Sequence, residues 1–415
     1  MIIKRFEADG FRNLKDVELE LDPELNILCG RNAQGKTNIL EAIWLCSGER
    51  SFRGAKDREL IGTDRDKMSL LLDFEDRRRT QSISYSMLRR DMKNKKITLN
   101  GVNVRTPSGL FGALGCVIFT PEDLGLSKGP PDNRRGFIDL SVSQIKVSYR
   151  DVVDKYRRIL DQRNLHLKHI AGGRPDDGML DIWDMQLAQM GAYISVLRYN
   201  YCKKLQRTAA ELFSELSGGA EQLTIDYHST VFETLDGRND YRNDLFNEYL
   251  ERLKASRRED MGAGFTIRGI HRDDLKCSIN GLYAKDYASQ GQHRSIALIL
   301  KLSQAYILSG EVGDTPCILL DDVLSELDGM RRSFIMEKIH GMQVLITCCE
   351  EEAVKKYRGK LFHVENGSVL QGEKLAGRAP PTRSRGLRTN EVWAPLCDVS
   401  GSERAYSLPR LHSCR

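Results

Sequence analysis

Eight residues near the start of the chain have the types and the order that bind a phosphate group. From Gly30 to Thr37 they follow the pattern glycine, four residues, glycine, lysine, then serine or threonine. The glycines let backbone N–H groups curl around an anion, and a helix beginning near Lys36 would point its positive end at that anion. A chance match in a glycine-rich turn is the alternative, but apolar residues before the motif and a helix-like run after it favour the phosphate loop. We predict that the nucleotide contacts come from Gly30, Arg31, Asn32, Ala33, Gln34, Gly35, Lys36, Thr37 and Asn38.

An apolar stretch later in the chain ends in two neighbouring acids. Residues 318–320 are Ile, Leu and Leu, and Asp321 and Asp322 follow them. Three consecutive aliphatic side chains indicate a buried parallel strand rather than an exposed acidic turn. Such a strand would carry both carboxylates to the sheet edge where α/β proteins bind ligands. We predict that Asp321 and Thr37 hold Mg²⁺, while Asp322 orients the attacking water and is catalytic together with Lys36.

Two further tetrads identify the kind of phosphate-binding protein. Residues 289–292 read Ser-Gln-Gly-Gln, and residues 325–328 read Ser-Glu-Leu-Asp. In order with the phosphate loop and the paired acids, they resemble the signature motif and D-loop of the ATP-binding-cassette superfamily. In that superfamily the signature serine caps a helix that faces the γ-phosphate bound by the other protomer. The resemblance therefore assigns Ser289, Gly291 and Gln292 to the nucleotide of a second copy, although Ser289 alone could be an ordinary helix cap.

Further motifs are distributed over about 370 positions. They are Phe11-Arg12-Asn13, Pro121-Glu122-Asp123-Leu124, the group Arg134, Arg135, Phe137 and Asp139, Gln162-Arg163-Asn164, His271-Arg272-Asp273-Asp274-Leu275, and Tyr287-Ala288 before the signature with Arg294 after it. In these motifs the chain closely resembles the RecF family of bacterial recombinational-repair ATPases. The resemblance implies an α/β fold, with an ABC-type P-loop ATPase head like that of SMC proteins and an inserted, mostly helical domain without long arms.

The same resemblance implies a function and partners. A RecF protein is a weak, DNA-stimulated ATPase that uses ATP and Mg²⁺, dimerises when ATP binds, and acts at single-strand gaps and stalled forks. It helps RecO and RecR to load the recombinase RecA, in the setting of DNA replication, recombination and the SOS response. The alternative within this fold is another SMC-like ATPase that does not act in gap repair. A metabolic kinase would not need the signature serine, and a transporter subunit would carry a switch histidine where Thr347 stands. Many cassette ATPases also carry glutamate where this chain has Asp322.

Composition places the chain among globular proteins without membrane spans. It has 415 residues, of which 40% are hydrophobic and 29% charged, and no apolar run approaches the ~20 residues of a membrane helix. The first residues lack the pattern of a secretory signal, and the ten cysteines form no CxxC pair, so we expect reduced thiols and a cytoplasmic location. The formal net charge is +5, and residues 376–415 hold seven arginines against three acids. Any DNA binding must therefore come from local basic patches.

The order of patterns along the chain predicts four segments. We expect residues 1–119 to form the first part of the head, 120–261 the helical insertion, 262–375 the rest of the head, and 376–415 a disordered basic tail. Apolar side chains from Trp183 to Tyr201 repeat at alternating intervals of four and three residues. That repeat is typical of a coiled coil, but only about three heptads exist, which favours a helical hairpin packed in a globular lobe.

Several basic groups are candidates for DNA phosphate contacts, which supply affinity without sequence choice. A solvated charged face is the alternative for each of them. We find no helix-turn-helix, zinc-finger or OB pattern, so recognition of DNA structure is expected rather than base readout. The candidate residues are Arg77, Arg78, Arg79, Arg89, Arg90, Lys128, Arg134 and Arg135.

Overall fold

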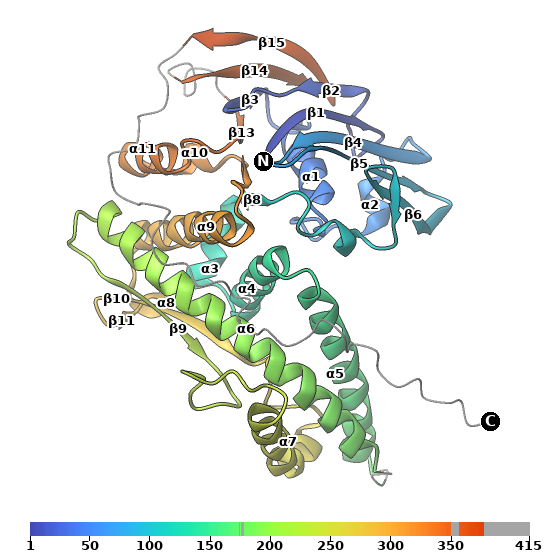
Figure 1. The fold of residues 1–415 in the computed structure, drawn as a ribbon, viewed down its shortest axis with the longest axis vertical. Helices are drawn as coiled ribbons and strands as arrows, with labels where there is room; N and C mark the ends of the chain where they lie inside the picture. Colours follow the sequence, from blue (N-terminus) through green and yellow to red (C-terminus); the bar gives the residue numbers. More distant parts are fainter. Residues whose placement is uncertain (174, 176–177, 350–356, 377–415) are drawn as a thin grey trace.

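A mostly parallel sheet forms the centre of the head. The computed structural model describes residues 1–173, 175, 178–349 and 357–376, and the side chains at 92–94 and 371–373 are left out of the description. In spatial order the sheet runs β15 (Ser368–Ala376), β14 (Arg358–Glu365), β3 (Leu25–Cys29), β13 (Val344–Cys348), β12 (Cys317–Leu320) and β8 (Cys116–Phe119). All neighbours are parallel except β14 and β15. Figure 1 shows this sheet at one end of the molecule and a helical lobe at the other.

The central strands are mostly apolar because both faces of the sheet are covered. Every residue of β3, β8, β12 and β13 is buried. On one face, Leu28, Leu319 and Leu345 pack against α1 (Lys36–Cys46) and the second head sheet. On the other face, Ile27 and Ile318 join a core that continues into the helical lobe. This pattern explains the continuous aliphatic runs from which the sequence predicted buried parallel strands.

The second head sheet is antiparallel. Its order is β2 (Val17–Glu20), β1 (Ile2–Asp9), β4 (Lys67–Glu75), β5 (Thr80–Leu88), β6 (Asp91–Leu99) and β7 (Val102–Val104). Alternate residues of β4 and β5 are buried, as expected for strands with one covered face. Asn100 and Gly101 have positive φ values of 53° and 76° and join β6 to β7 in a hairpin turn, for which Asn-Gly is a favoured sequence.

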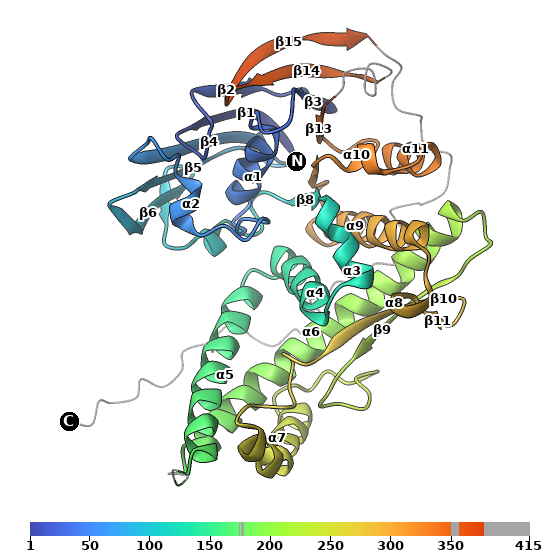
Figure 2. The same ribbon diagram turned by 180° about the vertical axis from the view of Figure 1, so that it is seen from behind.

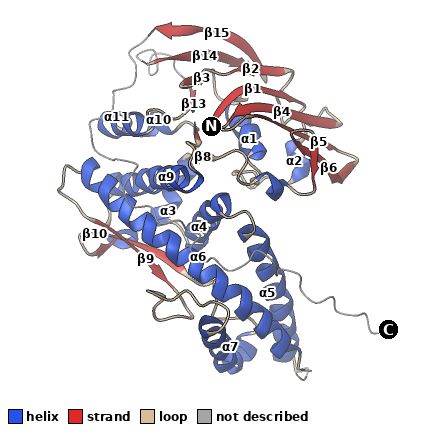
Figure 3. Cartoon of the chain, in the orientation of Figure 1, coloured by secondary structure: helices blue, strands red, loops and turns tan. Residues whose placement is uncertain are grey.

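The helices belong to the head, to the lobe or to the region between them. The head contains α2 (Asp57–Leu60), α10 (Val323–Glu326), α11 (Gly329–Lys338) and the 3₁₀ turns η1 (Pro107–Leu110) and η2 (Pro121–Leu124). The lobe consists mainly of α4 (Pro131–Ile145), α5 (Tyr149–Ala171), α6 (Met179–Leu216) and α7 (Asp244–Ala263), as Figure 3 shows by its helix colouring. Between head and lobe lie α3 (Gly125–Lys128), α8 (Ala284–Tyr287) and α9 (Gln290–Val312), with α9 packed on α6.

The long helix α6 contains the predicted heptad run and is a core helix of the lobe. All residues from 191 to 198 are buried, so the helix is covered on every side there. A coiled-coil seam would bury only one stripe. The α5–α6 pair therefore packs inside a globular lobe, as the sequence pattern favoured.

A small sheet in the lobe joins segments that the sequence patterns separated. β9 (Leu223–His228) pairs with β10 (Asp274–Ile279), which also pairs with β11 (Leu282–Tyr283). β9 lies in the segment predicted as the insertion, whereas β10 lies in the segment predicted as the second part of the head. Strand pairing between segments so distant in sequence leaves no local signal, so the predicted boundary at 261 divides one sheet.

Buried ion pairs explain two of the motifs in the lobe. Arg163 of α5 is fully buried and lies 2.7 Å from Asp184 of α6 and 2.7 Å from Asp260 of α7. Arg198 of α6 contacts both oxygens of Asp139 of α4, at 2.9 and 3.0 Å. These residues fasten the lobe helices to one another.

Two further predictions concern the C-terminal tail and membrane-spanning helices. The predicted disordered tail lies outside the described residues except for Ala376, the last residue of β15. Among the helices of the described residues, none has the length and apolar character needed to cross a bilayer.

Candidate functional site: a phosphate loop beside two aspartates

The phosphate loop connects β3 to α1 with the backbone shape that a phosphate cradle needs. Ala33 and Gly35 have φ values of 64° and 117°, which turn successive N–H groups toward one centre. A Cβ atom on Gly30 would lie 2.3 Å from the carbonyl oxygen of Val364 in β14, so only glycine fits there. The helix α1 begins directly after Gly35, with its N-terminus at the loop. The local geometry therefore matches the predicted anion site.

Lys36 lies over its own loop. Its Nζ donates to the carbonyl oxygens of Gly30 at 2.6 Å and of Arg31 at 2.9 Å, and lies 3.7 Å from Cys349 Sγ. The Cys349 thiol also donates to Asn32 Oδ1 at 2.9 Å. The ammonium group is thus held at the mouth of the cradle, where it can meet the terminal phosphates of a nucleotide.

The sheet topology brings the two predicted metal ligands together across 284 positions of sequence. Strand β13 lies between β3 and β12, so residues at the C-terminal ends of all three strands meet at one edge. Thr37 Oγ1 donates to Asp321 Oδ1 at 2.8 Å. Thr347, the fourth residue of β13, donates to the same oxygen at 3.0 Å. Burial raises the pKa of Asp321, while the two hydroxyl groups act in the opposite direction.

Asp322 stands beside this cluster in an unusual backbone conformation. Its φ of 53° lies in the left-handed region, and its side chain is exposed. The backbone N–H of Asp322 donates to Thr347 Oγ1 at 2.8 Å, and Ser325 donates to Asp322 Oδ1 at 2.9 Å. Asp322 lines the same cavity as the phosphate loop. This turn therefore places its carboxylate at the nucleotide side of the strand end.

The structure adds residues that the sequence patterns did not assign to the site. Arg12 binds the fully buried Glu41 of α1 through two hydrogen bonds of 2.5 and 2.8 Å. Asn13 accepts a hydrogen bond from Asn38 at 2.7 Å, and Arg53 donates to Asn38 at 3.0 Å. In the sequence, Glu41 is the one acid in the otherwise apolar run 39–43, and this was the available signal that a basic partner for Glu41 exists.

These residues surround an open cavity of about 870 Å³. Its lining includes Asn32, Lys36, Thr37, Asp322 and Thr347, and none of it comes from α9. The volume suits a nucleotide, since small-molecule sites span roughly 300–1,000 Å³.

The signature residues lie on a separate surface. Ser289 caps α9, its Oγ accepts from Gln292 N at 3.2 Å, and Gln292 Oε1 accepts from Ser289 N at 2.8 Å. The Gln292 amide also donates to Glu221 at 2.6 Å. Ser289 is exposed and does not line the cavity around Lys36. The single chain therefore does not bring Ser289 and Gly291 to its own phosphate loop.

The predicted DNA-contacting residues fall into two groups. Five of them have exposed side chains, namely Arg77, Arg78, Arg79, Arg90 and Lys128. Three are held by the protein: Arg89 donates to the carbonyls of Arg65, Ile61 and Gly62, Arg134 pairs with Asp274 at 2.7 Å, and Arg135 donates to the Asp273 carbonyl at 2.6 Å. Arg134 is only 2% exposed, so a DNA contact by Arg134 is wrong on structural grounds. Its sequence neighbours gave no sign of the acid 140 residues away.

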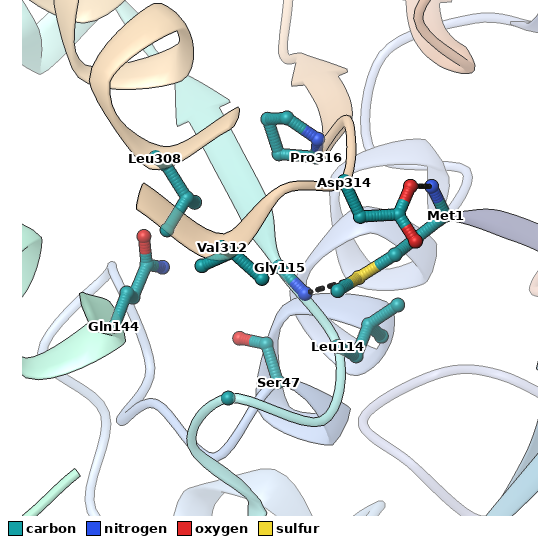
Figure 4. A pocket seen from close by; sticks show the side chains of 10 residues that line it. Met1, Ser47, Leu114, Gly115, Gln144, Leu308, Val312, Asp314 and Pro316 are labelled. Atoms are coloured by element: carbon teal, nitrogen blue, oxygen red, sulfur yellow. Dashed lines mark hydrogen bonds and ion pairs between the residues drawn. The ribbon is translucent and has the colours of Figure 1, made fainter. Parts of the chain in front are cut away.

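A much smaller hollow lies beside the first residue, where Figure 4 shows the Met1 ammonium group paired with Asp314 at 2.6 Å. The Gly115 N–H also donates to Met1 Sδ at 3.1 Å. The hollow has about 10 Å³, room for about one water molecule, and therefore cannot hold a nucleotide.

Comparison with known proteins defines the class. Residues 2–368 match the family described as RecF/RecN/SMC N terminal domain. An SMC head domain from Pyrococcus furiosus superposes with a TM-score of 0.50 at 14% identity, covering 90% of this chain and 96% of that one, which supports the fold alone. The chain is an ABC-type ATPase head of the SMC kind.

Closer relatives identify the family within this class. The chain is 35% identical over 374 residues to the DNA replication and repair protein RecF of Clostridium tetani, covering 89% of this chain and all of that protein. It is 38% identical over 354 residues to RecF of Acetivibrio thermocellus, covering 85% and 94%. A solved structure described as the recombination mediator protein RecF-ATPrS in the RecFOR pathway has a TM-score of 0.82 at 36% identity, covering 90% of this chain and 98% of that one. The chain belongs to the RecF family.

Proposed function

We propose that this chain is a DNA-binding ATPase of recombinational repair that uses ATP to close a dimer on gapped DNA. The observation that carries the proposal is the separation of two half-sites. Lys36, Thr37, Asp321 and Asp322 gather at one edge of the sheet, while Ser289 is exposed elsewhere at the start of a 23-residue helix. A second copy can supply its Ser289 to this cavity, and full-length similarity to RecF proteins favours this role over that of another SMC-like ATPase.

ATP binding would use the phosphate loop and two oxygen ligands. The N–H groups between Gly30 and Thr37 cradle the phosphates, and Lys36 exchanges its loop carbonyls for the terminal phosphate oxygens. Thr37 Oγ1 and Asp321 Oδ1, already 2.8 Å apart, are hard oxygen ligands of the kind that Mg²⁺ prefers. Bound Mg²⁺ would neutralise charge on the phosphates. Thr347 holds Asp321 in position for that contact.

Hydrolysis would depend on Asp322. Its carboxylate is exposed at the cavity and oriented by the Ser325 hydroxyl, so it can accept a hydrogen bond from an attacking water. The shorter side chain, in place of the glutamate of many cassette ATPases, fits slow turnover. Slow turnover suits a switch in which the ATP-bound dimer must persist on DNA.

DNA contacts would come from the basic residues whose side chains are exposed. These are Arg77, Arg78, Arg79, Arg90 and Lys128. Phosphate contacts by such side chains give affinity for many sequences and weaken as salt rises. Through RecO and RecR the chain would help to load RecA at gaps in the cytoplasm, including during the SOS response.

Sedimentation with a non-hydrolysable ATP analogue tests the dimer switch. We expect the wild-type chain to be a monomer or weak dimer without nucleotide and a dimer with it. Ser289→Arg should bind the analogue but stay monomeric, because a bulky cation replaces the small hydroxyl. Ser214→Arg adds the same side chain at an exposed position of α6 and should dimerise normally. A Ser289→Arg dimer as stable as wild type would refute the trans arrangement.

Nucleotide binding is tested separately with Lys36→Met, which removes the cation at the cradle. We expect the variant to lose analogue binding and ATP turnover. Turnover equal to that of wild type, with or without gapped DNA, would remove the phosphate-loop assignment.

A further inference from the structure

The helical lobe contains a second large cavity, remote in sequence from the phosphate loop. It measures about 730 Å³ and lies where the end of β9 and the loop after it meet α7. Figure 2 shows β9 and α7 together in the lobe, at the opposite end of the molecule from the strands β14 and β15. Nothing in the ATPase mechanism uses this cavity.

Two arginines that line the cavity are partly buried. Arg252 lies on α7, and Arg268 lies between α7 and β10. Within the residues that the structure describes, neither guanidinium forms an ion pair or a hydrogen bond with the protein. By contrast, the buried Arg163 and Arg198 of the same lobe each pair with an aspartate. Partial desolvation of a charge is costly unless an opposite charge compensates it, so this pair is suited to an anionic ligand.

The rest of the lining is aromatic and polar. Tyr199, Tyr227 and Phe232 contribute rings, and Thr230 contributes a hydroxyl group. Tyr227 is fixed because its hydroxyl donates to the buried Asp273 at 2.5 Å. Aromatic rings and guanidinium groups in one cavity are the combination that holds an unstacked base together with its phosphate.

The acids in the lining limit which nucleic acid can enter. Asp226 and Glu233 are exposed and also face the cavity. A duplex backbone presents a regular row of phosphates and would bring some of them against these carboxylates. A single flexible nucleotide can place its one phosphate at Arg252 and Arg268 and avoid the acids. The aromatic rings would remain unused by a duplex, whose bases are stacked inside.

We propose that this cavity binds one nucleotide of single-stranded DNA, with its phosphate on Arg252 and Arg268 and its base against the Tyr199 side of the cavity. The inference rests on the proposed role at gapped DNA and assigns the single-stranded part of the gap to the lobe. The exposed arginines of the head would then contact the adjoining duplex. The proposal accounts for single-strand binding in a chain without an OB pattern.

Fluorescence anisotropy with the full-length chain tests the proposal, using labelled oligo(dT) and a labelled duplex of equal length with and without ATP. We expect Arg252→Gln and Arg268→Gln each to weaken oligo(dT) binding about tenfold, as expected when a charge-assisted hydrogen bond is removed. The slope of log Kd against log salt should fall by about 0.7 for each phosphate that the protein no longer neutralises. Tyr199→Leu should weaken oligo(dT) binding about fivefold with an unchanged salt slope. Duplex affinity should not change in any of the three.

Arg258→Gln is the matched control, because Arg258 lies on the same helix, is exposed and does not line the cavity. Arg252→Lys keeps the charge and should recover part of the affinity, which separates a charge effect from misfolding. Equal losses for duplex and oligo(dT), or no loss for either, would overturn the proposal. Poly(L-glutamate) binding that Arg252→Gln abolishes while oligo(dT) binding persists would also overturn it, in favour of an acidic protein segment.

ATP-dependent dimerisation, measured by sedimentation without DNA, keeps the two hypotheses distinct. If wild type does not dimerise with ATP, the dimer switch fails, while the oligo(dT) comparison without ATP still decides the role of the cavity.

Discussion

Glu49 connects protonation to the stability of the junction between head and lobe. It follows α1, is 4% exposed, and its Oε1 has no hydrogen-bond partner among the described residues. Burial raises the pKa of this carboxyl group from its ordinary 4.5 to about 8, against the opposing charges of Arg150 and Arg50. The folded chain therefore keeps the proton while the unfolded chain releases it. Stability is highest below pH 4.5 as far as this group is concerned, and is lost as the pH rises toward 8.

The perturbation is Glu49→Gln, which keeps the size of the side chain and cannot ionise. One pKa unit corresponds to about 1.4 kcal/mol, so Glu49 should cost the folded state about 3 kcal/mol at about pH 7 and about 5 kcal/mol above about pH 8. We expect the glutamine variant to be close to wild type near pH 4.5. Its advantage in the free energy of unfolding should grow steadily up to about pH 8 and then level off.

Urea unfolding followed by far-UV circular dichroism between about pH 5 and about pH 9 measures this difference. Glu251→Gln is the control, because Glu251 is an exposed residue of α7, and it should follow wild type at every pH. The reasoning is refuted if the gap between Glu49→Gln and wild type is constant across the range, or if wild type gains stability relative to the variant as the pH rises.

Three other changes test the site and the lobe. Gly30→Ala should abolish ATP binding, because its Cβ would lie 2.3 Å from the Val364 carbonyl oxygen, whereas Gly136→Ala meets no neighbour within 4 Å and should bind normally by equilibrium dialysis. Asp322→Asn should bind ATP, hydrolyse it at least about a hundredfold more slowly, and dissociate from gapped DNA more slowly than wild type in a surface-based assay. Normal hydrolysis by this variant would move the catalytic role elsewhere. Arg163→Met removes the arginine that pairs with the buried Asp260 and one of the two arginines on Asp184, which keeps Arg257. It should lower the free energy of unfolding by about 3–5 kcal/mol in urea; a loss below about 1 kcal/mol would contradict the role of Arg163 in holding the lobe helices together.

The parts of the site that could be predicted are those that depend on residues adjacent in the sequence. The phosphate loop, the aliphatic strand before Asp321 and the cap at Ser289 depend on local backbone shape and on burial, both of which leave short patterns. The structure places all three as expected: the loop joins a strand to a helix, Asp321 lies beside Thr37, and Ser289 begins α9.

The parts that could not be predicted depend on partners distant in sequence. The sequence suggests that Arg134 contacts DNA, but in the fold β10 brings Asp274 to its guanidinium group. Thr347 was visible only as the residue in place of a switch histidine, and its contact with Asp321 follows from the position of β13 between β3 and β12. The pairing of β9 with β10 is equally invisible, because a register is set by the two strands together.

The continuity of α9 has a mechanical consequence. The helix begins at the signature and runs for 23 residues, about 35 Å, before a short turn leads directly into β12 and Asp321. A hydrogen-bonded helix of this length is stiff along its axis, so a pull on its N-terminal end must be taken up at its other end. That end is restrained by the pairing of Asp314 with the Met1 ammonium group. Engagement of Ser289 by a second protomer would thus pull on the strand that ends at Asp321, the metal ligand that we propose, so that each active site would respond to the occupancy of the other.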